Sequence, residues 1–242
     1  MELNLLHFYP DLMSLYGSYA NLSVLARTLE QMGNTVTITY VEPGDEADIE
    51  GADFLFMGAG TEKRQKFALT DFLRHGEDIK KAAEGGTAML FAGTAMELLG
   101  TRITDAEAKT WNGLGLLPFT VKQSAKRTVG DVYGHSDVCQ EPVVGFMNKS
   151  SILTGVETPL LTALDLGFGN ETKGGAEGIH YKNVFGSHLT GPLLAKNPRL
   201  LDAVITAIYE QRGEACPAIP KDAWAEEGYA VTARELKALC GK

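Results

Sequence analysis

The sequence predicts an α/β protein in which a mostly parallel sheet lies between two layers of helices. Two observations indicate this fold. Apolar strand patterns alternate with amphipathic helix patterns through the first half of the chain. Those strands are short, nearly continuous apolar runs, which is typical of strands buried on both faces. Connections of the strand–helix–strand kind join parallel neighbours and put helices on the faces of the sheet.

The first strand and the first helix are the clearest of these elements. Residues 3–8 (LNLLHF) form a short apolar strand, and residues 19–34 (YANLSVLARTLEQMGN) follow as a helix. The apolar residues of that helix recur at helical spacing on one face. Gly33 stands where a left-handed C-terminal cap is expected.

The alternation continues to the middle of the chain. Residues 35–41 (TVTITYV) are β-branched and predict a second strand, and residues 53–58 (DFLFMG) predict a third. A charged helix is expected over residues 62–84, and it leads to a fourth strand over residues 87–93 (TAMLFAG). This spacing favours a parallel sheet with helices on both faces.

The second half is richer in glycine and in strand patterns. Short strands are expected at residues 127–134, 142–148 and 183–189, and we interpret the glycine-rich stretch 167–178 as a surface turn. A last long helix is expected over residues 197–213.

One domain, residues 1–212, therefore accounts for most of the chain. Residues 213–242 are expected to be a C-terminal extension with a short helix. That helix is predicted to begin at Thr232, which with Glu235 matches a capping box.

Composition and charge argue against several classes of partner. The net charge of −9 argues against a nucleic-acid backbone as the main partner. No apolar run approaches the ~18 residues of a membrane-spanning helix, and the first residues lack a signal-peptide pattern, so a cytoplasmic location is expected. We interpret the three cysteines as free thiols. The five histidines show no zinc-binding spacing, so we expect neither a metal nor a cofactor.

Three stretches are expected at the carboxyl edge of the sheet, where ligands bind in open parallel sheets. The first, residues 58–65 (GAGTEKRQ), carries Gly58 and Gly60, whose backbone N–H groups can approach a ligand closely. The second, residues 90–100 (LFAGTAMELLG), reads as a buried strand, a sharp turn and a helix, and has Gly93 at the turn. The third is residues 185–198 (FGSHLTGPLLAKNP).

Over residues 3–212 the chain resembles the class I glutamine amidotransferases of the cobyric acid synthase type. Within them it is most similar to the amidotransferase subunits (GatD) of lipid II isoglutaminyl synthases. The resemblance implies a flavodoxin-like, three-layer α/β/α fold. It rests on these stretches: FYPDLMSLYGSYANLSVL, GAGTEKRQ where the family has Gly-Gly-Gly-x-Asp-Arg-Glu-Gln, GLGLLP, KRTVGD, VVGFMN and EGIHYKNVFGSHLTGPLLAKNP.

The resemblance also implies a chemistry from which this chain departs. In the family a cysteine on the elbow attacks the glutamine side-chain amide, and a histidine on a later loop activates it. The family elbow, Gly-Ile-Cys-Gly-Gly-Tyr-Gln-Leu-Leu-Gly, places the cysteine at Gly93 and the glutamine at Glu97. The family histidine, in Tyr-Leu-His-Gly-Pro, falls at Thr190, and the family's Glu-Asn-His segment falls at residues 147–149 (MNK).

The nucleophile and its base are therefore both expected to be lost. A side chain at a strained elbow costs about 1–3 kcal/mol, and glycine avoids that strain, so loss of the cysteine keeps the turn. One alternative is a relocated pair, Thr94 and His188, because His188 lies two residues before Thr190 in a predicted strand. The simpler interpretation of His188 is a buried strand histidine whose hydrogen bonds are satisfied.

Two arginines are candidate ligand-binding residues by the same resemblance. Arg127 corresponds to an arginine that holds glutamine in the family, and Arg64 to the arginine after the glycine turn. The alternative for Arg127 is a surface arginine, and the alternative for Arg64 is a charge at a helix N-terminus. Glu97 is expected to lie behind the site or to face solvent.

The resemblance implies a heterodimer with a Mur-ligase-like subunit that uses ATP to amidate the second-residue glutamate of the peptidoglycan stem. Three functional hypotheses remain open from the sequence. The chain is a subunit of this kind without glutaminase activity, a sensor that binds glutamine or another small carboxylate, or a glutaminase with a relocated nucleophile.

Overall fold

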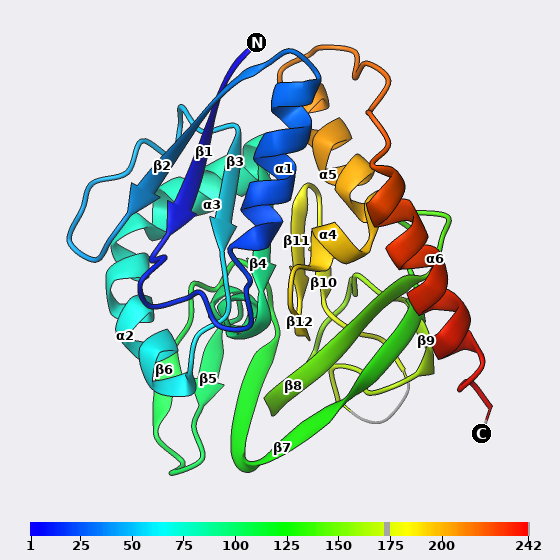
Figure 1. Cartoon of the computed structure of the whole chain (residues 1–242). Helices are drawn as coiled ribbons and strands as arrows, with labels where there is room; N and C mark the ends of the chain where they lie inside the picture. Colours follow the sequence, from blue (N-terminus) through cyan, green and yellow to red (C-terminus); the bar gives the residue numbers. More distant parts are fainter. Residues whose placement is uncertain (172–174, 242) are drawn as a thin grey trace.

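The structure is a computed structural model that describes residues 1–171 and 175–241. Its centre is a six-stranded sheet. Every strand pairing in this sheet is parallel except that of β10 with β11, which is antiparallel. Figure 1 shows this sheet between two layers of helices. In spatial order the strands are β10 (Ile179–Tyr181), β11 (Val184–Ser187), β4 (Ala88–Ala92), β3 (Phe54–Met57), β1 (Glu2–Phe8) and β2 (Thr35–Val41).

Two layers of helices bury the two faces of this sheet. The front layer consists of α1 (Ala20–Gln31), α4 (Leu193–Lys196) and α5 (Pro198–Gln211). The back layer consists of α2 (Glu62–Phe72), the 3₁₀ turn η1 (Leu73–His75) and α3 (Gly76–Gly85). The α/β class and the flavodoxin-like, three-layer architecture that the sequence predicts are therefore confirmed.

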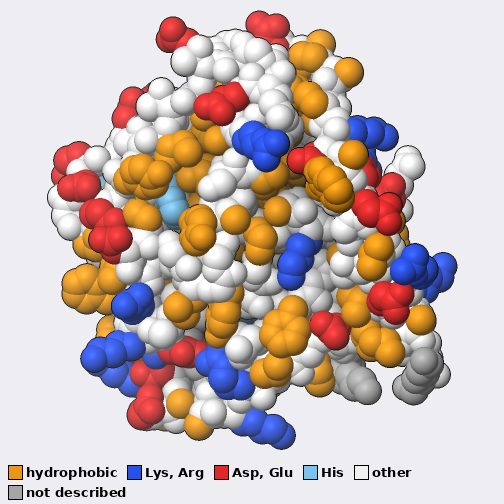
Figure 2. Space-filling model, in the orientation of Figure 1, with side chains coloured by type: hydrophobic (Ala, Val, Ile, Leu, Met, Phe, Trp, Pro, Cys, Tyr) orange, Lys and Arg blue, Asp and Glu red, His pale blue; other side chains and the backbone are white. Residues whose placement is uncertain are grey.

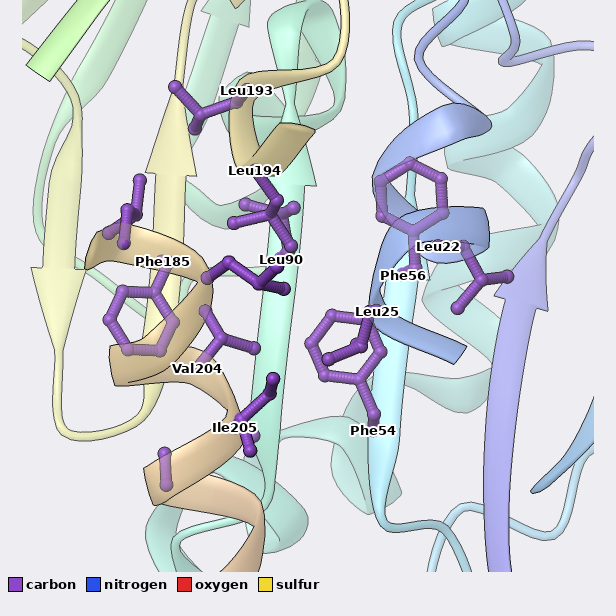
Figure 3. Packing of buried hydrophobic residues seen from close by; sticks show 14 of the residues in the cluster. Leu22, Leu25, Phe54, Phe56, Leu90, Phe185, Leu193, Leu194, Val204 and Ile205 are labelled. Atoms are coloured by element: carbon purple, nitrogen blue, oxygen red, sulfur yellow. The ribbon is translucent and has the colours of Figure 1, made fainter. Parts of the chain in front are cut away.

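The front core shows why the periodic sequence forms these elements. Leu22 and Leu25 of α1 are buried against Phe54 and Phe56 of β3, as Figure 3 shows. Gly33 follows α1 with a φ of +86°, a left-handed conformation that glycine adopts without strain. Burying this face stabilises α1 far more than its helix propensity does.

A second sheet lies at the carboxyl ends of the parallel strands of the first sheet (Figure 1). Its pairings are antiparallel except for one, β5 with β7, and it was not expected as a separate sheet from the sequence. Its strands are β12 (Leu189–Thr190), β8 (Val143–Thr154), β7 (Thr120–His135), β5 (Arg102–Thr104), β6 (Thr110–Asn112) and β9 (Ala163–Leu166). The glycine-rich stretch 167–178 follows β9, and its residues 172–174 lie outside the described part.

Two predicted helices differ from the structure. The helix expected over 62–84 is broken at η1, which turns the chain between α2 and α3. The helix expected after the elbow is the 3₁₀ helix η2 (Gly93–Leu99).

The C-terminal helix is longer than expected. Helix α6 spans Ala223–Lys237, and the carboxylate of Asp222 caps it by accepting from the N–H groups of Trp224 and Ala225. Thr232 is therefore inside the helix, where its hydroxyl donates to the carbonyl of Gly228, and the predicted capping box is wrong.

Helix α6 packs on the outer face of the second sheet. Leu236 and Tyr229 contact a small cluster that contains Tyr133 and Val144, and the Tyr229 hydroxyl donates to Pro142 O at 2.7 Å. Within the described residues, no helix is long and apolar enough to span a lipid bilayer.

Candidate functional site

The elbow lies at the carboxyl end of β4, between β3 and β11. Gly93 is buried at the turn with a φ of +61°, which only glycine adopts readily. The chain then enters η2, whose side chains Ala95, Met96 and Leu98 are fully buried. The sequence therefore forms a buried turn at the position where the resemblance leads us to expect the family's nucleophile.

The space above Gly93 is filled by Ala59. A Cβ built on Gly93 would lie 2.7 Å from the Cβ of Ala59 and 3.3 Å from its Cα. Real Cβ atoms do not approach so closely, so a side chain at position 93 requires the turn at Ala59 to move. In the motif that this chain resembles, Gly-Gly-Gly, Ala59 stands at the middle glycine. The larger residue at 59 and the smaller residue at 93 are therefore complementary.

The backbone of the glycine turn is already hydrogen-bonded within the protein. The Thr94 hydroxyl accepts from Gly60 N at 2.9 Å and donates to Gly60 O at 3.0 Å. The Ser18 hydroxyl accepts from Ala59 N at 3.3 Å. These backbone groups would have to leave their partners before they could bind a ligand or an oxyanion.

Gly58 and Gly60 are required by packing. A Cβ on Gly58 would lie 2.3 Å from the Met13 carbonyl oxygen and from the Ser18 hydroxyl, and a Cβ on Gly60 would lie 2.3 Å from the Met13 sulfur. The loop before α1 therefore presses on the turn so closely that both positions need glycine. Close contact with the protein explains these two candidate ligand-binding residues without a ligand.

Below the elbow, Glu97 is the centre of a buried polar network. Its carboxylate accepts from Gln65 Nε2 and Gln123 Nε2, each at 2.8 Å, and from the Ser151 hydroxyl at 2.5 Å. His188 Nε2 lies 3.2 Å from the same carboxylate. Glu97 is 1% exposed, so the part of our expectation that let it face solvent is wrong.

The network favours the charged form of Glu97 in spite of its burial. Burial alone raises the pKa of a carboxyl group, but His188, Ser151 and Gln65 hydrogen-bond to the charged form of Glu97. The net result is a pKa below the usual value for glutamate. Gln65 Nε2 also donates to the carbonyl oxygen of Thr94 at 2.7 Å, which fixes the elbow to this network.

His188 lies between two carboxylates. Its Nε2 faces Glu97, and its Nδ1 lies 3.5 Å from Oε1 of Glu177, an oxygen that also accepts from the His188 backbone N–H at 2.8 Å. Counting back from Gly191-Pro192 in the family motif Tyr-Leu-His-Gly-Pro, His188 stands at the tyrosine. The contact between His188 and Glu97 therefore joins two positions at which this chain departs from the family pattern.

The structure gives the proposed relocated pair, Thr94 and His188, separate partners. The Thr94 hydroxyl bonds Gly60, and His188 Nε2 faces Glu97 and the Ser151 hydroxyl, 3.3 Å away. The Thr190 hydroxyl donates to Phe146 O at 2.9 Å, in the β12–β8 pair, and a hydroxyl of ordinary pKa is not a general base.

The two candidate arginines also bind groups of the protein itself. Arg127 donates through Nη1 to Glu62 at 2.9 Å and through Nε to the Asn148 side chain at 2.6 Å, and its side chain is 40% exposed. Burial raises the pKa of Glu62, but hydrogen bonds from Ser150 and Arg127 lower it below its usual value. Arg64 is exposed, and its Nη1 donates to Asp11 O at 3.4 Å. Counted from Gly58, the arginine of the family motif falls at Lys63 and its glutamate at Arg64, so the correspondence expected for Arg64 is off by one residue.

Several residues of this region were missed by reasoning from the sequence. Gln123 and Ser151 carry no motif, and they meet because the β7–β8 register places them opposite each other. The only available signal was polar residues alternating along predicted strands. Within the described residues, no group of three or more His, Cys, Asp or Glu side chains could hold a metal ion.

Sequence comparison identifies the family. Residues 4–198 match the family model of the CobB/CobQ-like glutamine amidotransferase domain, and the chain belongs to this family.

Two relatives are subunits named GatD of glutamine-hydrolysing lipid II isoglutaminyl synthases. The subunit from Streptococcus pneumoniae (strain ATCC BAA-255 / R6) is 31% identical, over 87% of this chain and 82% of its own length. The subunit from Staphylococcus aureus (strain N315) is 28% identical, over 91% and 89%. A crystal structure of a glutamine amidotransferase shares the fold, with a TM-score of 0.51 and 14% identity over 84% of this chain and 98% of its own.

Proposed function

We propose that this chain is the amidotransferase-like subunit of a lipid II isoglutaminyl synthase type complex, and that it does not hydrolyse glutamine. The similarity to two GatD subunits over nearly the whole chain supports the first part. The Cβ of Ala59 occupies the space that a side chain at position 93 would need; this observation supports the second part and carries the proposal.

Glutamine hydrolysis by this family's route needs a thiolate and a base within hydrogen-bond reach of it. At the two family positions this chain has Gly93, which has no side chain, and Thr190, whose hydroxyl donates to Phe146 O. The buried His188 is engaged by Glu97 and Glu177 instead. A single sequence error would not produce this set of matched changes.

The partner in this proposal is a Mur-ligase-like subunit on the cytoplasmic side of the membrane. It would use ATP to amidate the second-residue glutamate of the peptidoglycan stem. The present chain would act as a scaffold for that subunit, which would take free ammonia in place of ammonia released from glutamine.

The test measures ammonia release from glutamine by the purified chain, with and without the ligase subunit. Amidation by the complex is then measured with glutamine and, separately, with an ammonium salt. We expect no ammonia release, and amidation with the ammonium salt only. Ammonia release by the unmodified chain would overturn the loss of hydrolysis, and failure to bind the ligase subunit would overturn the scaffold role.

The sensor hypothesis requires Arg127 to exchange its own partner, Glu62, for a ligand carboxylate. Isothermal titration and thermal-shift measurements with glutamine and related acids test it. Absence of heat and of a thermal shift with every ligand would exclude a sensor. The hypothesis of a relocated nucleophile is excluded by the same ammonia assay if the chain is inert alone and in the complex.

A further inference from the structure

We propose that the free edge of β2 pairs with β2 of a second copy of this chain, in antiparallel register about Ile38. β2 is the terminal strand of the first sheet, and within the described residues it pairs only with β1. This interface is independent of the proposed function, because it lies three strands away from the elbow strand β4.

The backbone of β2 presents unpaired groups along this edge. Thr35 N donates to Met1 O, and Val41 O accepts from Tyr9 N, so these two residues direct their backbone groups toward β1. The backbone N–H and C=O groups of successive residues in a strand point to opposite edges of that strand. Those of Val36, Ile38 and Tyr40 therefore point to the free edge. Such an edge is a template for pairing with another strand.

The connection between β2 and β3 makes contacts with the back layer of helices. Gly44 N donates to Asp71, and Glu46 forms an ion pair with Arg74. No backbone hydrogen bond joins this connection to Val36, Ile38 or Tyr40 in the described part of the chain.

The residues of β2 lack the usual protection of an edge strand. The sequence TVTITYV has no charged residue and no proline, and its seven residues stay in unbroken register with β1. Tyr40 is 60% exposed, and Val36 and Ile38 are half-buried on the same face. Figure 2 shows hydrophobic side chains gathered over β1 and β2, beside α1.

The strand is complementary to itself about Ile38. In an antiparallel pair centred there, Val36 lies opposite Tyr40 of the second copy, and Thr37 lies opposite Thr39. Aromatic–β-branched and Thr–Thr pairs are both favourable across antiparallel strands. In this register, residues whose backbone N–H and C=O groups face the free edge lie opposite each other. This is the arrangement of the hydrogen-bonded pairs in an antiparallel ladder.

Charge and symmetry favour a second copy over an unrelated strand. The chain carries a net charge of −9, yet this register brings no two acidic side chains together within the strand or beside it. Glu42, the first acid after β2, falls opposite Asn34 of the other copy. Such a pairing is isologous and closes after two chains, as most homodimers do.

The expected dimer is weak and reversible. Seven paired residues span about 23 Å, and an edge of this length buries less than the ~1,200 Å² of a standard stable interface. Sedimentation of the full chain at increasing concentration should therefore show the mass rising from 26.1 kDa toward twice that value. A constant mass of one chain up to millimolar concentration would overturn the proposal.

Charge substitutions at the two-fold axis test where the interface lies. Ile38→Lys and Ile38→Glu each set like charges against one another, so each should raise the dimer dissociation constant about tenfold or more. An equal mixture of the two variants should dimerise again, which shows that both are folded. Ile152→Lys, at a residue 47% exposed on β8, is the matched control and should dimerise like the unmodified chain. Unchanged dimerisation of Ile38→Lys would overturn the interface.

Cysteine cross-linking tests the register. A mixture of a Thr37→Cys chain and a Thr39→Cys chain should form a disulfide-linked dimer, because opposed residues of a non-hydrogen-bonded pair have Cα atoms about 4.5 Å apart. Either variant alone should cross-link no more than the unmodified chain with its three cysteines. If one variant alone formed as much disulfide-linked dimer as the mixture does, this register would be wrong.

Discussion

The Cβ of Ala59 lies 2.7 Å from the point where a Cβ on Gly93 would stand. A second pair of departures from the family pattern, Glu97 and His188, also meets in space, with 3.2 Å between the carboxylate and Nε2. In each pair one change fits the other: a larger residue fills the space above a smaller one, and an acid faces a base. Both contacts fit the proposal that this chain does not hydrolyse glutamine.

A cysteine at position 93 should be tolerated only together with a glycine at position 59. Gly93→Cys alone combines strain at positive φ with the contact to Ala59, so we expect it to lower the free energy of unfolding by about 2–5 kcal/mol. Adding Ala59→Gly should recover at least about 1 kcal/mol of this, as measured by urea denaturation. Strict additivity of the two changes would contradict the steric argument.

Recovery of glutaminase activity should need three substitutions. Gly93→Cys with Thr190→His restores the two family side chains, but Ala59 still occupies the space beside the thiol. We therefore expect ammonia release from glutamine only when Ala59→Gly is added, assayed with the ligase subunit present. The triple variant with Ser in place of Cys at position 93 is the control, and activity of the double variant alone would show that Ala59 moves freely.

The sequence predicted most of the first sheet, because each of its strands and helices buries a continuous apolar face. It did not predict the break before Gly76, where a Cβ would lie 3.0 Å from the Leu114 side chain, because that contact joins distant parts of the chain. Gly93 and Thr190 could be read from motifs. The contact of Ala59 with Gly93 could not, since it depends on how closely the loops after β3 and β4 approach each other.

Glu97 and His188 should be energetically coupled. Glu97→Gln removes the buried carboxylate that accepts hydrogen bonds from Gln65, Gln123 and Ser151, which typically costs about 1–3 kcal/mol. Combined with His188→Tyr, which restores the family's residues at both positions, the loss should be smaller than the sum of the two single losses by at least about 1 kcal/mol. Urea denaturation of the four proteins measures this coupling. Glu107→Gln, at an exposed position, should change stability by no more than about 0.5 kcal/mol.

His7 should make stability depend on pH between about 4 and 6.5. The His7 ring lies against the rings of Phe56 and Tyr40. Burial there lowers the pKa of His7 from 6.5 to about 4. In this window the unfolded chain binds more protons at this residue than the folded chain does, so stability rises with pH and is lost as pH falls. Titration of His7 should lower the free energy of unfolding by at most about 3 kcal/mol as the pH falls through this window.

His7→Leu should therefore flatten the curve of unfolding free energy against pH in that window. Urea denaturation at several pH values measures this slope. An unchanged slope in His7→Leu would mean that another group titrates there.

Helix α6 should stabilise the domain through its inner face, where Leu236 and Tyr229 pack on the second sheet. Leu236 is 8% exposed and packs with Tyr133 and Val144, so Leu236→Ala should cost about 2–3 kcal/mol in the free energy of unfolding. Trp224, on the same helix, is 88% exposed, and Trp224→Ala should change stability by less than about 0.5 kcal/mol. If both variants unfold like the unmodified chain, residues 213–241 are an appendage whose loss the domain tolerates. If Leu236→Ala alone is destabilised, the C-terminal extension is part of the folded unit, because it covers the outer face of β7 and β8.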